Sequence, residues 1–212
     1  KEGLPFMGYI EGELFGIQAK IFRISFSGEL AYEINVESDN GNYMWEKIME
    51  IGKEFKIQPY GTEALSILRI EMGHVAGSEL DGRTIPYDNG LEGMINKKKD
   101  FIGKRSLKRK AFTEKGREQI VGLVPIDKKT SIPEGSHLVV DHKLKSPNPK
   151  LGHVSASCWS VENNNPFSLA ILKNGKNTIG EKLYAVSPLK NISVQVEVVS
   201  QHYVDPDGKR VR

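Results

Sequence analysis

The sequence predicts an α+β protein in which an antiparallel sheet with flanking helices (residues 1–114) precedes a small all-β barrel or jelly-roll (residues 115–212). Three observations support this fold class. Apolar residues alternate in the first part of the chain, two helical stripes follow, and six short apolar runs separated by Asn, Gly and Pro fill the second half. We place the domain boundary in the charged segment 112–118, which contains Gly116.

Residues 8–36 are expected to form strands, because Ile10, Leu14, Ile17 and Ile21 recur between turn-prone glycines. A turn is expected at Ser27-Gly28-Glu29. The alternation that follows divides the side chains between two faces. One face holds Tyr32, Ile34 and Val36, and the other holds Ala31, Glu33 and Asn35.

Two amphipathic helices should come next. Ser38 or Asp39 can cap the first helix, Thr62 can cap the second, and Gly73 should end it. The apolar stripes are Met44, Ile48, Ile51 and Phe55 in the first helix and Leu65, Leu68 and Met72 in the second. A third, short helix is predicted over residues 101–111, with Asp100 as its cap. The six expected barrel strands are residues 120–124, 138–140, 154–157, 169–172, 182–186 and 194–199.

Composition restricts the kind of protein. The chain has 212 residues, of which 38% are hydrophobic and 27% charged, as in globular proteins. No apolar run approaches the length of a membrane span, and the first residues lack the apolar core of a secretory signal. Cys158 is the only cysteine, so no intrachain disulfide can form. We therefore expect a cytoplasmic protein without membrane contact.

The five histidines are scattered without metal-ligand spacing, so no metal site is expected. A net charge of +3 is too small to indicate a nucleic-acid partner for the whole chain. Residues 97–110, from Lys97 to Lys110, concentrate eight basic residues around one acid, Asp100. This stretch is either a solvated surface or a site for a polyanion, and the scarcity of aromatic residues favours an anionic tail over a nucleic acid.

Glu33 is the first candidate for a binding residue. If Tyr32, Ile34 and Val36 face the core, the Glu33 carboxylate faces a second surface, where it can accept two parallel hydrogen bonds from an amidine-like edge such as that of a pterin. An ordinary solvated strand glutamate is the alternative. Phe26 and Tyr32 flank Glu33 and can sandwich a flat heterocycle, although such aromatic residues more commonly pack in a core.

Arg69 lies on the apolar side of the second helix, where an arginine needs an anionic partner. That partner is either a ligand or one of the carboxylates of Glu63, Glu71 and Asp88. Other chemistry has no sequence signal: the chain has no glycine-rich dinucleotide loop, no serine nucleophile elbow, no CxxC and no HExxH. The residues alone therefore indicate a two-part α+β protein with one candidate carboxylate site.

Residues 22–34 read FRISFSGELAYEI and resemble the R-x-G-Y-T-G-E-x-G-[FY]-E-[IL] signature of the aminomethyltransferase superfamily, in the version found in sarcosine oxidase alpha subunits. Further matches occur in the family's order along nearly the whole chain. They are PYGTE (59–63), LRIEMG (68–73), DGRTIP (81–86), KDFIGKRSL (99–107), GHVS (152–155) and YVDPDG (203–208).

The resemblance implies the folate-binding, C-terminal part of an alpha subunit of heterotetrameric sarcosine oxidase. That enzyme demethylates sarcosine oxidatively, and the one-carbon unit passes to tetrahydrofolate to form 5,10-methylenetetrahydrofolate. The expected partners are the rest of the alpha subunit, the other subunits and a folate, for which a polyglutamated tail is compatible. FAD, FMN and NAD are expected in the rest of the complex, and the chain by itself is expected to have no oxidase activity.

The resemblance also assigns residues. Glu33 falls on the family's pterin-binding glutamate, Phe26 falls where many members have tyrosine, and Arg69 aligns with the second arginine of the A-R-D-x-L-R-L-E-A-G motif. The family's catalytic aspartate should precede residue 1, so no catalytic residue is expected here. Leu65 replaces the first arginine of the motif, and residues 132–135 (IPEG) lack the arginine of P-R-x-G. Both differences disfavour a glycine-cleavage aminomethyltransferase.

Three other functions stay open from the sequence. The first is a folate-dependent dimethylglycine or sarcosine dehydrogenase, or a fragment of a glycine-cleavage aminomethyltransferase. The second is a non-catalytic folate-binding module of the same superfamily. The third is a nucleic-acid-binding module that uses residues 97–110, for which steep salt dependence would be the evidence.

Overall fold

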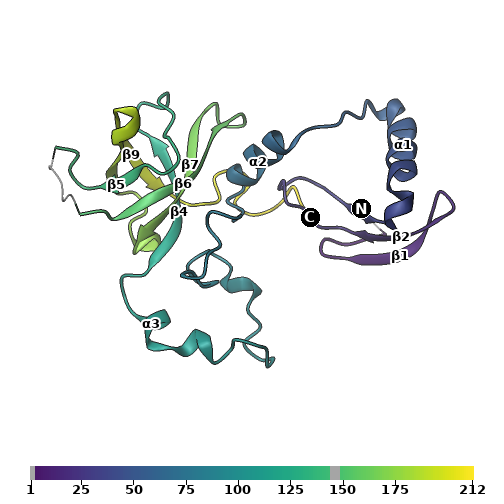
Figure 1. Cartoon of the computed structure of the whole chain (residues 1–212), viewed down its shortest axis with the longest axis horizontal. Helices are drawn as coiled ribbons and strands as arrows, with labels where there is room; N and C mark the ends of the chain where they lie inside the picture. The colour runs from purple at the N-terminus through teal and green to yellow at the C-terminus, as the bar shows by residue number, and fades with distance from the viewer. Residues whose placement is uncertain (1–2, 144–148) are drawn as a thin grey trace. The chain divides into compact units, whose positions relative to one another are not determined.

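The computed structural model describes residues 3–143 and 149–212 and contains two compact units (Figure 1). The N-terminal unit comprises the chain up to Arg69 together with Asp205–Arg212, and the barrel unit comprises Ile70–Val204. The fold is α+β with antiparallel sheets, as predicted. The predicted domain boundary between residues 114 and 115 stays a prediction. The compact units divide the chain differently, since residues 70–117 belong to the barrel unit. Among the described residues, no helix is both long and apolar enough to traverse a lipid bilayer.

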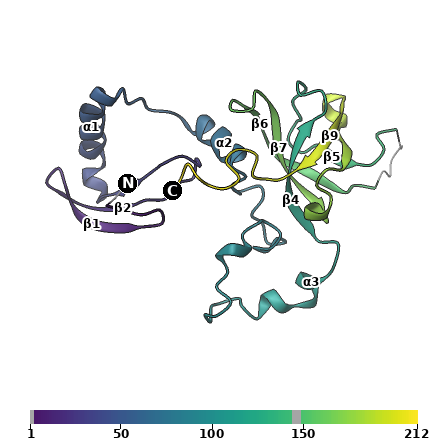
Figure 2. The ribbon, with the colours of Figure 1, turned by 180° about the vertical axis from the view of Figure 1, so that it is seen from behind.

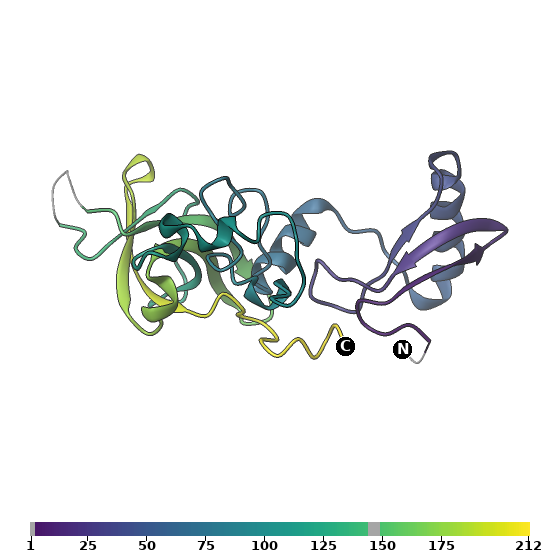
Figure 3. The same cartoon turned by 90° about the horizontal axis from the view of Figure 1, so that it is seen from below.

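The N-terminal unit is built on a three-stranded antiparallel sheet in the order β1 (Tyr9–Leu14), β2 (Ile17–Phe22), β3 (Glu33–Asn35). Phe15 and Gly16, with φ of 54° and 80°, make the two-residue turn between β1 and β2, since a tight hairpin turn requires left-handed backbone at both positions. The helix α1 (Gly41–Gly52) lies next to this sheet (Figure 3). The strands predicted within residues 8–36 are thus present, although β3 has only three residues.

Both predicted helices are present, but the predicted cap of the first helix differs from the structure. Asn40 precedes α1, whereas Ser38 and Asp39 lie one step earlier in the 3-10 turn η1 (Ser38–Asn40), so the predicted cap is wrong. Phe55 falls beyond α1 in the turn η2 (Lys53–Phe55) and is 76% exposed. The helix α2 spans Thr62–Glu71. Gly73, with φ of 73°, follows it as expected of a left-handed stop.

The predicted helix over residues 101–111 is wrong. The structure has only the 3-10 turn η4 (Ser106–Lys108) and the single-turn helix α3 (Lys110–Thr113) there. Gly103 adopts φ of 95°, which a helix interior does not allow, and like charges crowd this segment. Three further 3-10 turns lie elsewhere in the barrel unit: η3 (Glu92–Met94), η5 (Gly175–Asn177) and η6 (Pro188–Lys190).

Six antiparallel strands close into a barrel in the order β4-β7-β6-β5-β8-β9 (Figure 2). They are β4 (Glu118–Pro125), β5 (His137–Val139), β6 (Gly152–Ser160), β7 (Asn165–Lys173), β8 (Lys182–Ser187) and β9 (Ile192–Val199). Each predicted strand is confirmed. Leu123, Leu138, Val196 and Val198 fill the barrel with no exposed surface, as inward-facing residues of a small barrel should. The prediction of a barrel or jelly-roll is therefore resolved as a barrel.

Candidate functional site

The end of the β2–β3 hairpin holds three of the four predicted binding residues. Phe22 pairs with Glu33 across the two strands, so residues 23–32 form a loop whose ends meet at this pair. Phe26 lies within the loop and is 44% exposed, and Tyr32 lies at its end and is 45% exposed. Tyr32 lies before β3, which begins at Glu33, and it does not face a core. Both aromatic side chains are thus accessible, Tyr32 directly before Glu33 and Phe26 within the loop.

Glu33 itself is exposed, and no hydrogen bond or ion pair to its carboxylate occurs among the described residues. Directly paired residues of neighbouring strands project from the same face of a sheet, so Glu33, Phe22 and Tyr9 share one face. The rings of Tyr9 and Phe22 lie 4.7 Å apart between centroids, inclined at 33°. An accessible carboxylate thus stands beside an aromatic pair.

The next row of the same face is polar. Lys20 pairs with Asn35 on one side and with Glu11 on the other, and the Lys20 ammonium lies 3.6 Å from the Glu11 carboxylate. A hollow of about 380 Å³ borders this row and continues to Val36 and Glu37. The row of Glu33 on this face therefore carries aromatic side chains, and the next row carries polar side chains and borders the hollow.

Arg69, the fourth predicted residue, is 8% exposed in α2, as expected from its place on the apolar stripe. Two of the carboxylates considered as its partner make contacts of other kinds. Asp88 binds Arg117, and Glu71 accepts a hydrogen bond of 2.6 Å from the Ser160 hydroxyl. The structure does not place Arg69 within the exposed group formed by Phe26, Tyr32 and Glu33.

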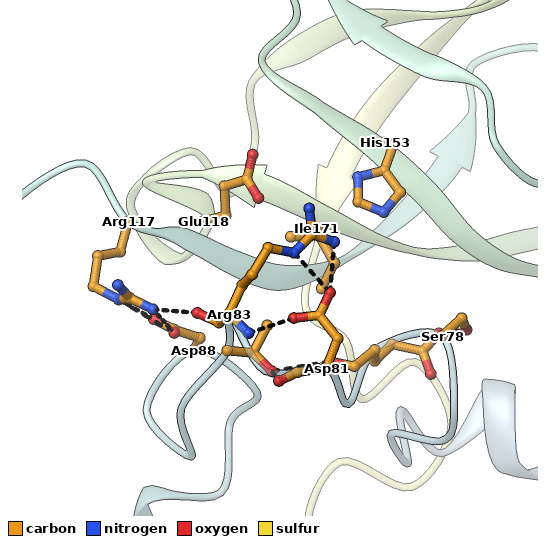
Figure 4. A pocket seen from close by; sticks show the side chains of 10 residues that line it. Ser78, Asp81, Arg83, Asp88, Arg117, Glu118, His153 and Ile171 are labelled. Atoms are coloured by element: carbon orange, nitrogen blue, oxygen red, sulfur yellow. Dashed lines mark hydrogen bonds and ion pairs between the residues drawn. The ribbon is translucent and has the colours of Figure 1, made fainter. Parts of the chain in front are cut away.

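A second polar pocket, which the sequence did not predict, lies on the barrel unit (Figure 4). Its volume is about 150 Å³, and it is lined by Ser78, Glu79, Asp81, Arg83, Thr84, Asp88, Arg117, Glu118, His153 and Ile171. These residues come from four separate stretches of the chain. The only sequence signal was the DGRTIP motif, which by itself did not indicate a pocket.

The charged groups of this pocket largely satisfy one another. Arg117 donates to both oxygens of the buried Asp88 carboxylate, and Arg83 donates to Asp81 through Nε at 3.0 Å (Figure 4). These contacts raise the pKa of Arg117 and lower the pKa of Asp81. Burial lowers the pKa of His153, which favours its neutral form. Four carboxylates therefore face two guanidinium groups, an arrangement that disfavours an anionic ligand.

The basic stretch, residues 97–110, forms a largely exposed segment that contains the turn η4 and the start of α3 but no continuous helix face. Lys97, Lys98 and Lys99 are exposed, and the Asn96 side chain accepts hydrogen bonds from the backbone of Lys98 and Lys99 at 3.0 and 3.3 Å. The Lys104 ammonium lies 6.0 Å from the centre of the Phe101 ring. Within the described part of the chain, no group of three or more His, Cys, Asp or Glu side chains is arranged to hold a metal ion.

The fold is similar to that of a solved glycine cleavage system aminomethyltransferase T from Bartonella henselae. The TM-score is 0.77 at 20% sequence identity, and the match covers 97% of this chain and 54% of the other. Residues 1–99 match the family model described as the GCVT N-terminal domain. The solved structure thus shows the fold, and the family model places an aminomethyltransferase-like domain in residues 1–99.

Two sarcosine oxidase alpha subunits are more similar in sequence. The one from Rhizobium meliloti (strain 1021) is 38% identical over 98% of this chain, and the one from Corynebacterium sp. (strain P-1) is 41% identical over 92%. An aminomethyltransferase from Thermoanaerobacter pseudethanolicus is 27% identical over 93%. The chain is thus homologous, over most of its length, to sarcosine oxidase alpha subunits, as the motifs predicted. It spans about a fifth of the length of those subunits.

Proposed function

We propose that this chain is the tetrahydrofolate-binding part of an alpha subunit of heterotetrameric sarcosine oxidase. In this role it accepts the one-carbon unit from the oxidative demethylation of sarcosine and releases 5,10-methylenetetrahydrofolate. The observation that carries the proposal is the exposed Glu33 carboxylate, which stands beside accessible aromatic rings within the segment that bears the family signature. Homology to sarcosine oxidase alpha subunits supports the choice of substrate.

The chemistry of Glu33 fits a pterin. The 2-amino group and N3 of the pterin are two parallel donors, and one ionised carboxylate can accept both. We assign Phe26 and Tyr32 to the faces of the ring system, and their accessibility supports this assignment, since each exposes nearly half of its surface. We assign Arg69 to the same site only because it aligns with the second arginine of the family motif. Its proposed role is to provide a positive charge for the anionic part of the folate.

The proposed contribution of this chain is to hold the acceptor. Fixing tetrahydrofolate in one orientation places N5 and N10 where a one-carbon electrophile can reach them, which raises the effective concentration of the reacting groups. Oxidation of sarcosine is assigned to the flavin-bearing parts of the complex, because the sequence lacks a glycine-rich dinucleotide loop. We therefore expect the chain alone to produce no hydrogen peroxide from sarcosine and to show no flavin absorbance.

The test is calorimetric titration of folinic acid into the complete oxidase with wild-type Glu33 and with Glu33→Gln. The amide keeps the shape of the side chain but opposes one of its own donors to a ring donor. We expect a loss of about 1.5–3 kcal/mol, the range for hydrogen bonds to charged groups, or roughly 10- to 150-fold in affinity. Thermal unfolding should change little, since Glu33 is exposed.

Glu13→Gln is the matched control, because Glu13 is also an exposed strand glutamate of the same sheet. This control should bind folinic acid as the wild type does. Equal affinities for wild type and Glu33→Gln, with equal unfolding temperatures, would show that Glu33 is an ordinary solvated residue and would refute the proposed site.

A further inference from the structure

Arg23, the arginine of the family signature, is a buried residue at the start of the loop formed by residues 23–32. It is 4% exposed, and its guanidinium donates to the Leu4 carbonyl at 2.9 Å and to the Val211 carbonyl at 3.4 Å. Its backbone pairs with Gly8 and Met7 at 2.9 and 2.8 Å. Arg23 therefore connects the start of this loop both to the segment before β1 and to the segment Asp205–Arg212. It points inward, away from any ligand at the exposed end of the hairpin.

The segment Asp205–Arg212 has its own folded form. Asp205 adopts φ of 46°, and its carboxylate accepts hydrogen bonds from the backbone N–H groups of Lys209 and Arg210 at 3.0 and 2.8 Å. The Gly208 N–H donates to the Asp205 carbonyl at 2.9 Å. These bonds, the one from Arg210 above all, lower the pKa of Asp205, so the turn is stable at neutral pH. The turn fixes where the Arg210 side chain begins.

Arg210 reaches the loop from this turn. Its Nη1 donates to the Glu29 carboxylate at 2.8 Å, and both side chains are partly exposed. Within the loop, the Glu29 N–H donates to the Ser27 hydroxyl at 3.4 Å, and the Gly28 N–H donates to the Ser25 hydroxyl at 3.0 Å. Gly28 has φ of 84°, a conformation that glycine adopts freely. The conformation of residues 25–29 (SFSGE) is thus stabilised by hydrogen bonds to its own serine hydroxyls and by the ion pair between Glu29 and Arg210.

We propose that Arg23 and Arg210 are positioning residues, which use the segment Asp205–Arg212 as a strap to fix the loop that presents Phe26 and Tyr32 beside Glu33. Neither arginine contacts the ligand. They keep the loop ordered before a ligand binds. An ordered loop loses less conformational entropy when it binds a flat ligand. The inference rests on the proposed function for its consequence in binding, but the ordering of the loop is testable without any ligand.

The experiment compares wild type, Arg210→Met and the exchanged pair Glu29→Arg/Arg210→Glu in the full chain, by hydrogen exchange of the Gly28 and Glu29 amides. Arg210→Met should speed their exchange by about fivefold, the upper end for an ion pair that is partly exposed. The exchanged pair should restore slow exchange. Arg23→Lys keeps a buried charge but cannot span both carbonyls, so it should speed exchange by at least about tenfold.

Lys209→Met is the matched control, since Lys209 lies in the same strap and pairs only with Asp207 at 2.8 Å among the described ion pairs. It should leave the loop amides unchanged. Affinity for folinic acid, measured in the complete oxidase, should fall about fivefold in Arg210→Met and recover in the exchanged pair. The proposed role of the strap would be refuted by either of two results. One is an unchanged rate of hydrogen exchange in Arg210→Met, and the other is a faster rate that Glu29→Arg/Arg210→Glu does not reverse. If wild type bound no folinic acid, the proposed function would fail, and the exchange data would still decide the strap.

Discussion

The guanidinium of Arg117 donates to both carboxylate oxygens of Asp88, with its Nε 2.9 Å from Oδ1 and 3.2 Å from Oδ2. The same carboxylate accepts the Ile85 N–H at 3.0 Å, and the Asp88 carbonyl accepts the Ile120 N–H at 2.8 Å. Arg117 also donates to the Arg83 carbonyl at 3.0 Å. One ion pair thus attaches the DGRTIP segment to the start of β4.

Loss of this pair should destabilise the barrel unit. In Asp88→Asn the Arg117 charge loses its partner in a site where Asp88 is 2% exposed. We expect a fall of about 3 kcal/mol in the free energy of unfolding, the lower end for breaking a buried ion pair. Urea denaturation measures it. Arg83→Met removes a guanidinium whose side chain is 83% exposed and should leave the midpoint of urea unfolding nearly unchanged. Equal effects of the two substitutions would contradict this assignment.

Gly73→Ala should also be strongly destabilising. A Cβ at Gly73 would lie 2.4 Å from the Gln201 carbonyl oxygen, and φ of 73° disfavours an L side chain. The left-handed conformation alone costs about 1–2 kcal/mol, and the clash adds to it, so the midpoint of urea unfolding should fall clearly. Gly77→Ala is the control, because a Cβ there meets no atom within 4 Å. A wild-type midpoint for Gly73→Ala would mean that α2 does not end as described.

His153 should make stability sensitive to mild acid. Burial, helped by Lys150, lowers the pKa of His153 below its ordinary 6.5, so the unfolded state binds this proton more readily than the folded state. Stability is therefore fully present above pH 6.5 and declines as the pH falls from there through the lowered folded-state pKa. His153→Gln should flatten this part of the profile. Identical slopes for wild type and variant just below pH 6.5 would rule out His153 as the source.

The basic stretch is expected to recognise the tail of a polyglutamated folate. Lys97, Lys98 and Lys99 are all exposed and available to carboxylates. The triple substitution Lys97/Lys98/Lys99→Ala should reduce the preference for polyglutamated over monoglutamated folate by several-fold, and more at low salt than at high salt. Calorimetry of both ligands in the complete oxidase measures the ratio. An unchanged ratio would leave these lysines as a solvated surface.

The sequence was most informative where a pattern and the final environment agree. The barrel strands alternate or run apolar between strong turn residues, and all six were located to within a few positions. Residues 101–111 show the opposite case. A helix was predicted there because Asp100 can act as a cap, but Gly103 takes a left-handed conformation that the sequence pattern does not reveal. A local pattern of residue types does not report the backbone angle of a single glycine.

The candidate site divides in the same way. Glu33 was found from alternation and the family signature, and it is exposed beside accessible rings. Tyr9 and Phe22 were missed as its neighbours, because strand register depends on pairing between distant residues. In the sequence, Arg23 and Glu29 were recognised as parts of the family signature, and Glu29 also as part of a turn, but no contact was predicted for either side chain. Their contacts with Val211 and Arg210 join segments far apart in the chain, and no spacing rule predicts such contacts.

Closure of the barrel also constrains how the protein can be made. β4 has β7 on one side and β9 on the other, so its second row of hydrogen bonds waits until β9 has been synthesised. During translation the nascent chain therefore carries a β4 edge without its β9 partner, and the sheet is still open. Closure of the barrel by strands that are distant in the sequence is slow. We expect a ribosome stalled before Ile192 to expose a strand edge of β4 that can template aggregation.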